Sequence, residues 1–244
     1  MNALWINRLC SYKRLPLSVE SAKRLVEIKT ERQDALLKKY KKKLSTNDIL
    51  AAANIQAVLL SEARAAKLYW REFRLLLPSF LGFHGRKPRA ADITNRLLDI
   101  GYHHLTNVVR KILDRNAVPS VMGILHVAHK TDSAPLAYDL VELFRADIVD
   151  AEVLRFLRLK KKVFINLDQR ELAHFLHEVN ERLERKYYLK DFKMCHPYTY
   201  YMELQILKFI SAVNHKTVFD PLHLPARHDS RCSLTPTETM LSLR

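Results

Sequence analysis

Apolar side chains recur along most of the chain at intervals of three and four residues, which is the spacing of one face of an α-helix. Capping residues and prolines mark where these apolar segments begin. The pattern predicts helices from after Ser18 towards Lys43, from a cap at residues 45–48 to about Phe73, from Asp92 to Asp114, from Pro135, from Asp150, from Asp168 to about Tyr188 and from Tyr198 to Val213. Only residues 163–167 alternate in the manner of a strand. We therefore expect an all-α fold with at most one short β segment.

Glycine is scarce, with four residues in a chain of 244, although 48% hydrophobic and 27% charged residues are ordinary for a globular protein. This scarcity excludes glycine-rich phosphate loops and dinucleotide-binding fingerprints, which need several glycines close together. It also argues against a hairpin-rich β fold. No apolar run approaches the roughly 18 residues of a membrane span. We expect one helical domain over residues 17–225, between a short N-terminal remnant (1–16) and a flexible tail (226–244).

The charge balance points to a polyanionic partner. Lysine and arginine number 41 against 26 aspartate and glutamate residues, which gives a formal charge of +15. A surplus of this size favours nucleic acid binding. Two basic runs, at residues 38–43 and 155–162, are candidates for phosphate contacts, although a solvated helix end is the simpler explanation for the first. The three cysteines lie far apart and form no CxxC pair, so we expect a reduced, cytoplasmic protein.

Two carboxylates interrupt apolar helix faces. Glu62 shares a face with Val58 and Leu59, and Asp139 lies three residues after Leu136 on the face of the helix that begins at Pro135. A carboxylate in such a position is unfavourable unless it is paired, protonated or bound to a metal. For Glu62, a structural ion pair with a nearby arginine or lysine explains the sequence as well as a functional site does.

Further candidate ligands lie close to Asp139 in the sequence. Glu142 follows Asp139 by three residues, so a cation would relieve the repulsion between them, unless Glu142 faces solvent beside Arg145. His126 ends the apolar stretch that begins at Gly123. Carboxylate and imidazole donors suit Mg²⁺ or Mn²⁺ better than a structural zinc ion. Such an ion beside a basic surface indicates metal-assisted phosphodiester chemistry.

Four segments, in this order, carry a resemblance to a known family: SEARAAKLYW (61–70), NRLLDIGY (95–102), GILH (123–126) and LAYDLVELFR (136–145). Together they resemble the helical catalytic domain of the CRISPR-associated endonuclease/integrase, or Cas-one, family. Residues 22–29 with Gln33 are similar to the helix that follows the family's N-terminal β-domain. The resemblance covers roughly residues 15–225.

The resemblance implies roles for individual residues. It places a divalent ion, Mg²⁺ or Mn²⁺, on Glu62, His126 and Glu142, with Asp139 as a second acidic catalytic position. It places Asn95 on the helix beside the site, where a structural role and a DNA contact are both open. The expected DNA-binding residues are Asn95, Arg64, Lys67 and Arg145 from the resemblance and Lys41, Lys42 and Lys43 from the basic run.

The resemblance also implies an activity and partners. Members of the family cut branched or single-stranded DNA and join spacer ends to a repeat, as two dimers bridged by the small Cas-two protein. Only about fifteen residues precede the recognisable helix here, so the β-domain that builds the homodimer is expected to be absent and the homodimer is doubtful. Two alternatives remain: a truncated or solitary relative that binds DNA with little catalysis, and a helical nucleic-acid-binding scaffold whose acidic residues only form ion pairs.

Overall fold

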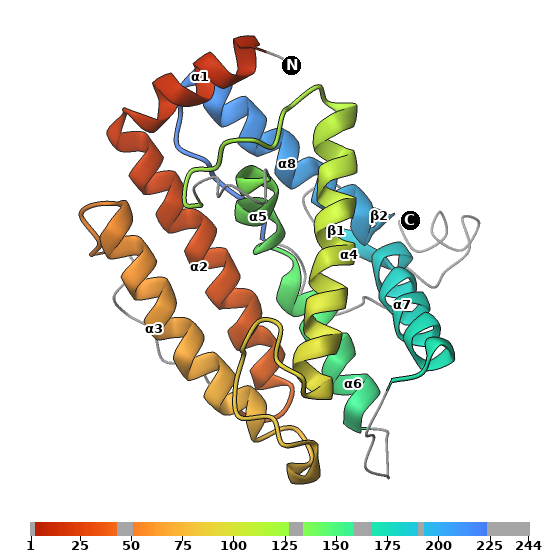
Figure 1. Ribbon diagram of the computed structural model, residues 1–244. Coiled ribbons are helices and arrows are strands. Elements are labelled where there is room, and N and C mark those ends of the chain that lie inside the picture. Colours follow the sequence, from red (N-terminus) through yellow and green to blue (C-terminus); the bar gives the residue numbers. More distant parts are fainter. Residues whose placement is uncertain (1–2, 43–50, 127–133, 159–166, 190–192, 224–244) are drawn as a thin grey trace.

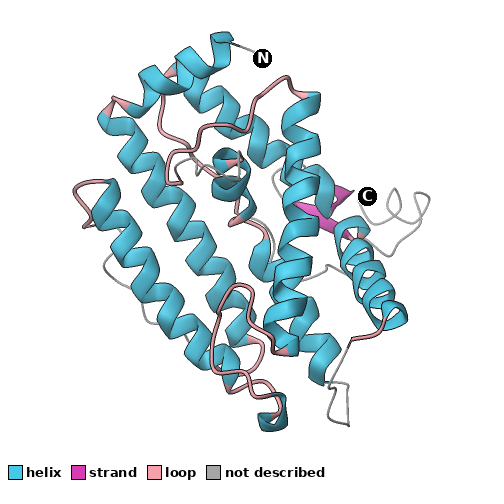
Figure 2. Cartoon of the chain, viewed as in Figure 1, coloured by secondary structure: helices cyan, strands magenta, loops and turns pink. Residues whose placement is uncertain are grey.

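The computed structural model describes residues 3–42, 51–126, 134–158, 167–189 and 193–223, and these residues are predominantly helical (Figure 1). One short antiparallel hairpin, which pairs Lys186 with Pro197, is the sheet of the described part (Figure 2). The elements in chain order are α1 (Ala3–Lys13), α2 (Pro16–Lys38), α3 (Ile55–Arg74), the short helix η1 (Ser79–Leu81), α4 (Ile93–Arg115), α5 (Pro135–Val141), the π-helical segment η2 (Ala146–Asp150), α6 (Ala151–Arg158), α7 (Gln169–Glu184), β1 (Lys186–Leu189), β2 (Met194–Pro197) and α8 (Tyr198–His215). The expected fold class is confirmed.

Helices α2 and α3 lie side by side and run in the same direction, and α4 runs back across the bundle (Figure 1). The run of α5, η2 and α6 lies between α2 and α4 and contacts both. Gly101 permits this packing, since a Cβ at that position would lie 2.5 Å from Val149 Cγ1 in η2. Helix α2 therefore lies between α3 on one side and the run of α5 and η2 on the other (Figure 1). None of the described helices is long and apolar enough to cross a membrane.

Several predicted helix starts are confirmed by their caps. Asp92 accepts a hydrogen bond from the Asn95 backbone N–H at the start of α4, and Asp168 accepts one from the Glu171 backbone N–H at the start of α7. Pro135 occupies the first turn of α5, as its fixed φ favours. A short polar side chain before an apolar run therefore identified the starts of α4 and α7 correctly.

Other predictions differ from the structure. A helix, α1, precedes the first predicted one, because Trp5, Leu9 and Tyr12 are spaced on one face and buried. Helix α3 begins at Ile55 with Asn54 as its cap, whereas the predicted cap at residues 45–48 lies outside the described residues.

Two further corrections concern the second half of the chain. Asp150 does not cap a helix, because the chain is already helical before it and its carboxylate accepts hydrogen bonds from Tyr69 and Tyr102. Helix α7 ends at Glu184 rather than near Tyr188, because residues 186–189 pair with β2. Four residues of the predicted strand, 163–166, lie outside the described residues.

Candidate functional site

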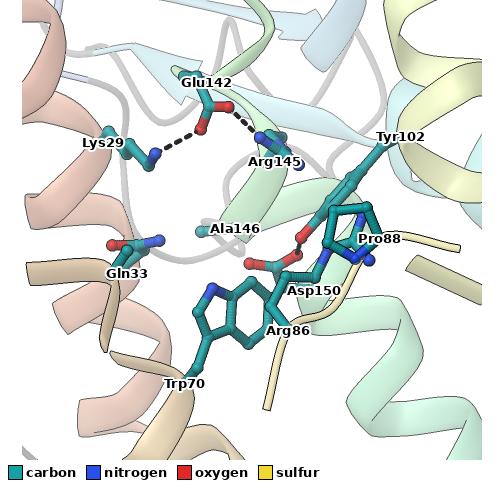
Figure 3. Close-up of a pocket in the computed structure, with 11 residues that line it drawn as sticks. Lys29, Gln33, Trp70, Arg86, Pro88, Tyr102, Glu142, Arg145, Ala146 and Asp150 are labelled. Atoms are coloured by element: carbon teal, nitrogen blue, oxygen red, sulfur yellow. Dashed lines mark hydrogen bonds and ion pairs between the residues drawn. The ribbon is translucent and has the colours of Figure 1, made fainter. Parts of the chain in front are cut away.

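Two carboxylates from different helices meet at one lysine. Glu62 lies midway along α3, Glu142 follows the last residue of α5, and Lys29 projects between them from α2. The Lys29 Nζ atom lies 2.5 Å from Glu62 Oε1 and 2.8 Å from Glu142 Oε2. Arg145 donates to the other Glu142 oxygen, Oε1, so that the two cations contact the two oxygens of one carboxylate (Figure 3). The four side chains form a set of two negative and two positive charges.

These charges are largely removed from solvent. The side chains of Lys29, Glu62 and Glu142 are 13%, 14% and 9% exposed. Burial alone would raise the pKa of Glu142, but the charges of Arg145 and Lys29 outweigh it and lower the pKa to about 2. Burial likewise opposes the charge on Lys29, yet Glu142 and Glu62 raise the pKa of Lys29 above its ordinary value. Glu142 and Lys29 are therefore both charged at neutral pH. Glu142 does not face solvent, which was one of the two interpretations that its sequence position allowed.

The turn that carries His126 is built around the buried carboxylate of Asp139. Asp139 Oδ2 accepts hydrogen bonds from the backbone N–H groups of Ile124 at 2.5 Å and Leu125 at 3.0 Å. Asp139 Oδ1 accepts one from the His126 backbone N–H at 2.9 Å and contacts the imidazole Nδ1 at 2.6 Å. Gly123 is required here, since a Cβ at that position would lie 2.5 Å from Asp139 Oδ2. Asp139 is therefore a positioning residue for His126.

One ring nitrogen of His126 remains for another partner. Nδ1 is bound to Asp139, and the side chain is 40% exposed. The hydrogen bond that the imidazole donates to Asp139 raises the pKa of His126 against partial desolvation, and the charges of Asp139, Glu142 and Glu62 add to the effect. Imidazoles that bind a metal through one nitrogen commonly donate the other to a carboxylate. The pairing with Asp139 thus prepares His126 Nε2 for a ligand role.

The donor types suit a divalent ion, but the side chains are not gathered around one point. No group of three or more His, Cys, Asp or Glu side chains within the described ranges is close enough to hold a metal ion. Lys29 instead lies between Glu62 and Glu142. Carboxylate oxygens and an imidazole nitrogen are ligands that Mg²⁺ or Mn²⁺ accepts. Glu62, His126 and Glu142 fit such an ion in their chemistry, and they could close around it only if Lys29 left its present place.

Asn95 holds the basic loop that precedes α4. It is 2% exposed, and its Oδ1 accepts hydrogen bonds from the Lys87 backbone N–H at 2.8 Å and from the Arg86 guanidinium at 3.0 Å. Its Nδ2 donates to the Gly85 carbonyl at 3.0 Å. Of the two roles that the sequence left open for Asn95, these contacts favour the structural one. The loop that Asn95 holds brings Arg86 to the site.

Two arginines flank the ring of Tyr102 beside the paired carboxylates. The guanidinium carbons of Arg86 and Arg145 lie 5.3 and 3.6 Å from the ring centroid. The Tyr102 hydroxyl donates to Asp150 Oδ1 at 2.5 Å. Burial raises the pKa of Asp150 to about 6, although hydrogen bonds from its two tyrosine partners and the charge of Arg145 oppose the shift. Figure 3 shows these side chains with Trp70 around a cavity of about 150 Å³.

A larger groove of about 820 Å³ shares part of this wall and passes along α4. Its lining includes two of the three candidate ligands, His126 and Glu142, whereas Glu62 is not among the residues that line it. Four arginines line it: Arg86, Arg89, Arg110 and Arg145. Sequence reasoning selected only Arg145 among them. Arg86 and Arg89 could have been found from the basic loop at residues 82–89, which lies just before the cap at Asp92.

The remaining predicted DNA-binding residues lie elsewhere. Arg64 and Lys67 are exposed on α3, but neither is among the residues that line the cavity or the groove. Lys41 is exposed, and Lys42 lies 3.7 Å from Glu72. Lys43 lies outside the described residues. The structure therefore joins Glu62 and Glu142 through Lys29, pairs Arg145 with Glu142, places His126 on the same groove as Glu142, and leaves Lys41 and Lys42 outside the lining of that groove.

Comparisons with known proteins agree on one family. The family model for CRISPR associated protein Cas1 matches residues 4–184. The CRISPR-associated endonuclease Cas1 1 of Saccharolobus solfataricus is 32% identical over 169 residues, which are 64% of this chain and 47% of that protein. The chain therefore spans about half the length of this relative.

Solved structures share the fold. A casposase bound to an integration product superimposes with a TM-score of 0.78 at 20% identity, covering 100% of this chain and 74% of the casposase chain. A chain of a Cas6-RT-Cas1–Cas2 complex superimposes with a TM-score of 0.73 at 20% identity, covering 89% of this chain and 26% of that one. The matched residues include all of the candidate site, since residues 4–184 contain Glu62, His126 and Glu142. The chain belongs to the Cas1 family of CRISPR-associated proteins.

Proposed function

We propose that this chain is a DNA endonuclease/integrase that depends on Mg²⁺ or Mn²⁺ held by Glu62, His126 and Glu142. The observation that supports this proposal most directly is the arginine-lined groove whose wall includes His126 and Glu142. Phosphodiester chemistry needs an anionic donor set for the cation and positive charge for the DNA backbone. In this protein two of the candidate donors, His126 and Glu142, line the same groove as the arginines.

The side chains around the site would have different roles in the reaction. The bound ion would polarise the scissile phosphate and activate a water or a DNA hydroxyl. Arg86 and Arg145 lie beside the carboxylates, where they would bind phosphate oxygens of the strand and stabilise the charge that develops on them. Asp139 holds His126 in one orientation. Before a metal binds, Lys29 keeps Glu62 and Glu142 together.

The partners are DNA and the small Cas2 protein. The casposase relative is bound to an integration product, and another relative forms a complex with Cas2. By analogy, the substrate here is branched DNA, single-stranded DNA or a spacer end that enters the arginine-lined groove. Because electrostatic contacts to the backbone carry most of such binding, affinity should fall steeply as the salt concentration rises.

The test pairs a cleavage and strand-transfer assay with a gel-shift assay on the same protein preparations. Glu62→Ala, His126→Ala and Glu142→Ala should each abolish Mn²⁺-dependent turnover and leave DNA affinity near that of the wild type, because the phosphate contacts come from arginines. Glu72→Ala is the matched control, since Glu72 lies on the same helix as Glu62 but pairs with Arg71 and Lys42. Turnover by Glu62→Ala at the wild-type rate would refute the proposed site.

One observation favours a second candidate, a DNA-binding scaffold without catalysis. Glu62 and Glu142 already have cationic partners in Lys29 and Arg145, as purely structural carboxylates would. In that case neither the wild type nor the variants would cleave, all would bind DNA, and calorimetry would detect no Mn²⁺ binding. The endonuclease/integrase proposal requires Mn²⁺ binding that is lost in Glu62→Ala.

A further inference from the structure

Lys29 occupies the place where a cation is expected. Its Nζ atom lies 2.5 Å from Glu62 Oε1 and 2.8 Å from Glu142 Oε2, although the three residues come from three separate elements. The lysine side chain is 13% exposed, so its charge is balanced by these two carboxylates more than by water. Two carboxylates brought together in a buried place repel each other unless a cation lies between them.

At Glu142, the oxygen atom that contacts Lys29 is the one that remains for a metal ion. Arg145 already pairs with Glu142 Oε1. The other oxygen, Oε2, contacts Lys29, which lies between it and Glu62. An ammonium group and a divalent ion cannot both occupy this position, because each needs direct contact with the same oxygens and like charges repel at such distances. Metal binding and the present position of Lys29 are therefore mutually exclusive.

We propose that Lys29 is a resident cation, which holds Glu62 and Glu142 together in the metal-free protein and is displaced when the divalent ion binds. This inference rests on the proposed function, since it takes Glu62 and Glu142 as ligands. Lys29 stabilises the metal-free fold, and by the same contacts it competes with the metal. Removing it has two linked consequences: the metal-free protein loses stability, and the site binds the ion more tightly.

The experiment compares Lys29→Met with the wild type by calorimetric titration with Mn²⁺. Methionine keeps much of the length of the lysine side chain and removes its charge. The affinity for Mn²⁺ should rise by about tenfold, because the ion no longer has to displace an ammonium group from the two carboxylates. In EDTA the melting temperature of Lys29→Met should lie below that of the wild type, and saturating Mn²⁺ should raise it by more than it raises the wild-type value.

Lys23→Met is the matched control. Lys23 lies on the same helix, its side chain is 11% exposed, and it pairs with one carboxylate, that of Glu20, at 2.8 Å. Its replacement should leave the Mn²⁺ affinity unchanged. An affinity for Mn²⁺ that is equal or weaker in Lys29→Met than in the wild type would overturn the inference and make Lys29 a permanent part of the site.

A second measurement needs no variant and covers the case in which Lys29→Met does not fold. Labelling of amines in the wild-type protein, read by mass spectrometry, should modify Lys29 slowly in EDTA and faster in saturating Mn²⁺, with Lys23 unchanged. Unchanged labelling of Lys29 in protein that calorimetry shows to be loaded with Mn²⁺ would overturn the inference alone. Absence of Mn²⁺ binding from both the wild type and Lys29→Met would instead refute the proposed metal site, and the inference with it.

Discussion

Asp139→Asn tests whether the turn at residues 124–126 depends on a buried charge. In the wild type, the Asp139 carboxylate accepts three backbone hydrogen bonds, at 2.5, 3.0 and 2.9 Å, and contacts His126 Nδ1 at 2.6 Å. Asparagine has nearly the same shape, but its amide nitrogen would face N–H donors in place of an acceptor oxygen. The substitution therefore removes acceptors without opening a cavity.

The expected loss follows from these contacts. Hydrogen bonds to a charged group contribute about 1.5–3 kcal/mol each, and unpaired buried donors add a penalty of their own. Such losses are not additive within one network, so we expect a net destabilisation of about 4 kcal/mol. For a chain of this size that corresponds to a fall in melting temperature of roughly 8–16 °C.

The assay is thermal and urea unfolding of the variant beside Asp220→Asn. Asp220 is 85% exposed and lies 3.7 Å from Lys208 Nζ, so its replacement should change the stability by less than about 0.5 kcal/mol. A second readout is specific to His126: its pKa, followed by NMR of the imidazole, should fall because its largest raising influence is Asp139. If Asp139→Asn unfolds within 2 °C of the wild type, estimated as less than about 1 kcal/mol, the reasoning about the turn is wrong.

Three further predictions concern neighbouring groups. Asp150→Asn should flatten the pH dependence of the free energy of unfolding. In the wild type, folding raises the pKa of Asp150 from 3.8 to about 6, which contributes about 3 kcal/mol of stability that is fully present below pH 3.8 and is lost as the pH rises through 6. Urea unfolding at pH 4 and pH 8 measures this difference. Asn95→Ala should release the loop that carries Arg86 and lower the stability by about 2 kcal/mol. Hydrogen exchange of the Lys87 backbone N–H should become faster, because this N–H donates its hydrogen bond to Asn95 Oδ1 in the wild type. Arg89→Ala should weaken DNA binding equally for all sequences and reduce the salt slope by about 1, whereas the exposed Arg170, outside the groove, should be replaceable without effect.

Local signals in the sequence predicted most of the helices, and non-local pairing accounts for most of the differences. Asp92 and Asp168 identified the starts of α4 and α7 because capping depends only on neighbouring residues. The hairpin of β1 and β2 was missed, since a four-residue strand becomes stable only through its partner. Helix α1 did leave a local signal, because Trp5, Leu9 and Tyr12 share one face.

The same distinction applies to the site. The apolar faces around Glu62 and Asp139 correctly indicated that both carboxylates are shielded from water, at 14% and 1% exposure. Their partners could not be found in this way, because Lys29 lies 33 residues before Glu62 and on a different helix. Asp139 and Glu142 were expected to repel each other, but they turn to different partners, one to the His126 turn and the other to Lys29 and Arg145.

The charge balance of the site bears on how a DNA strand could approach it. In the metal-free protein, Lys29 and Arg145 neutralise Glu62 and Glu142, so this cluster itself neither attracts nor repels a phosphate strongly. The attraction comes from the other arginines of the groove, which would bind the strand before any metal is present. Exchange of Lys29 for a divalent ion adds one positive charge at the carboxylates. The ammonium group of Lys29 leaves the carboxylates but stays near them, because Lys29 is part of the cavity wall. The site would then gain affinity for a phosphate only when the catalytic ion is in place, so that DNA binding along the groove and phosphate binding at the site should respond differently to Mn²⁺.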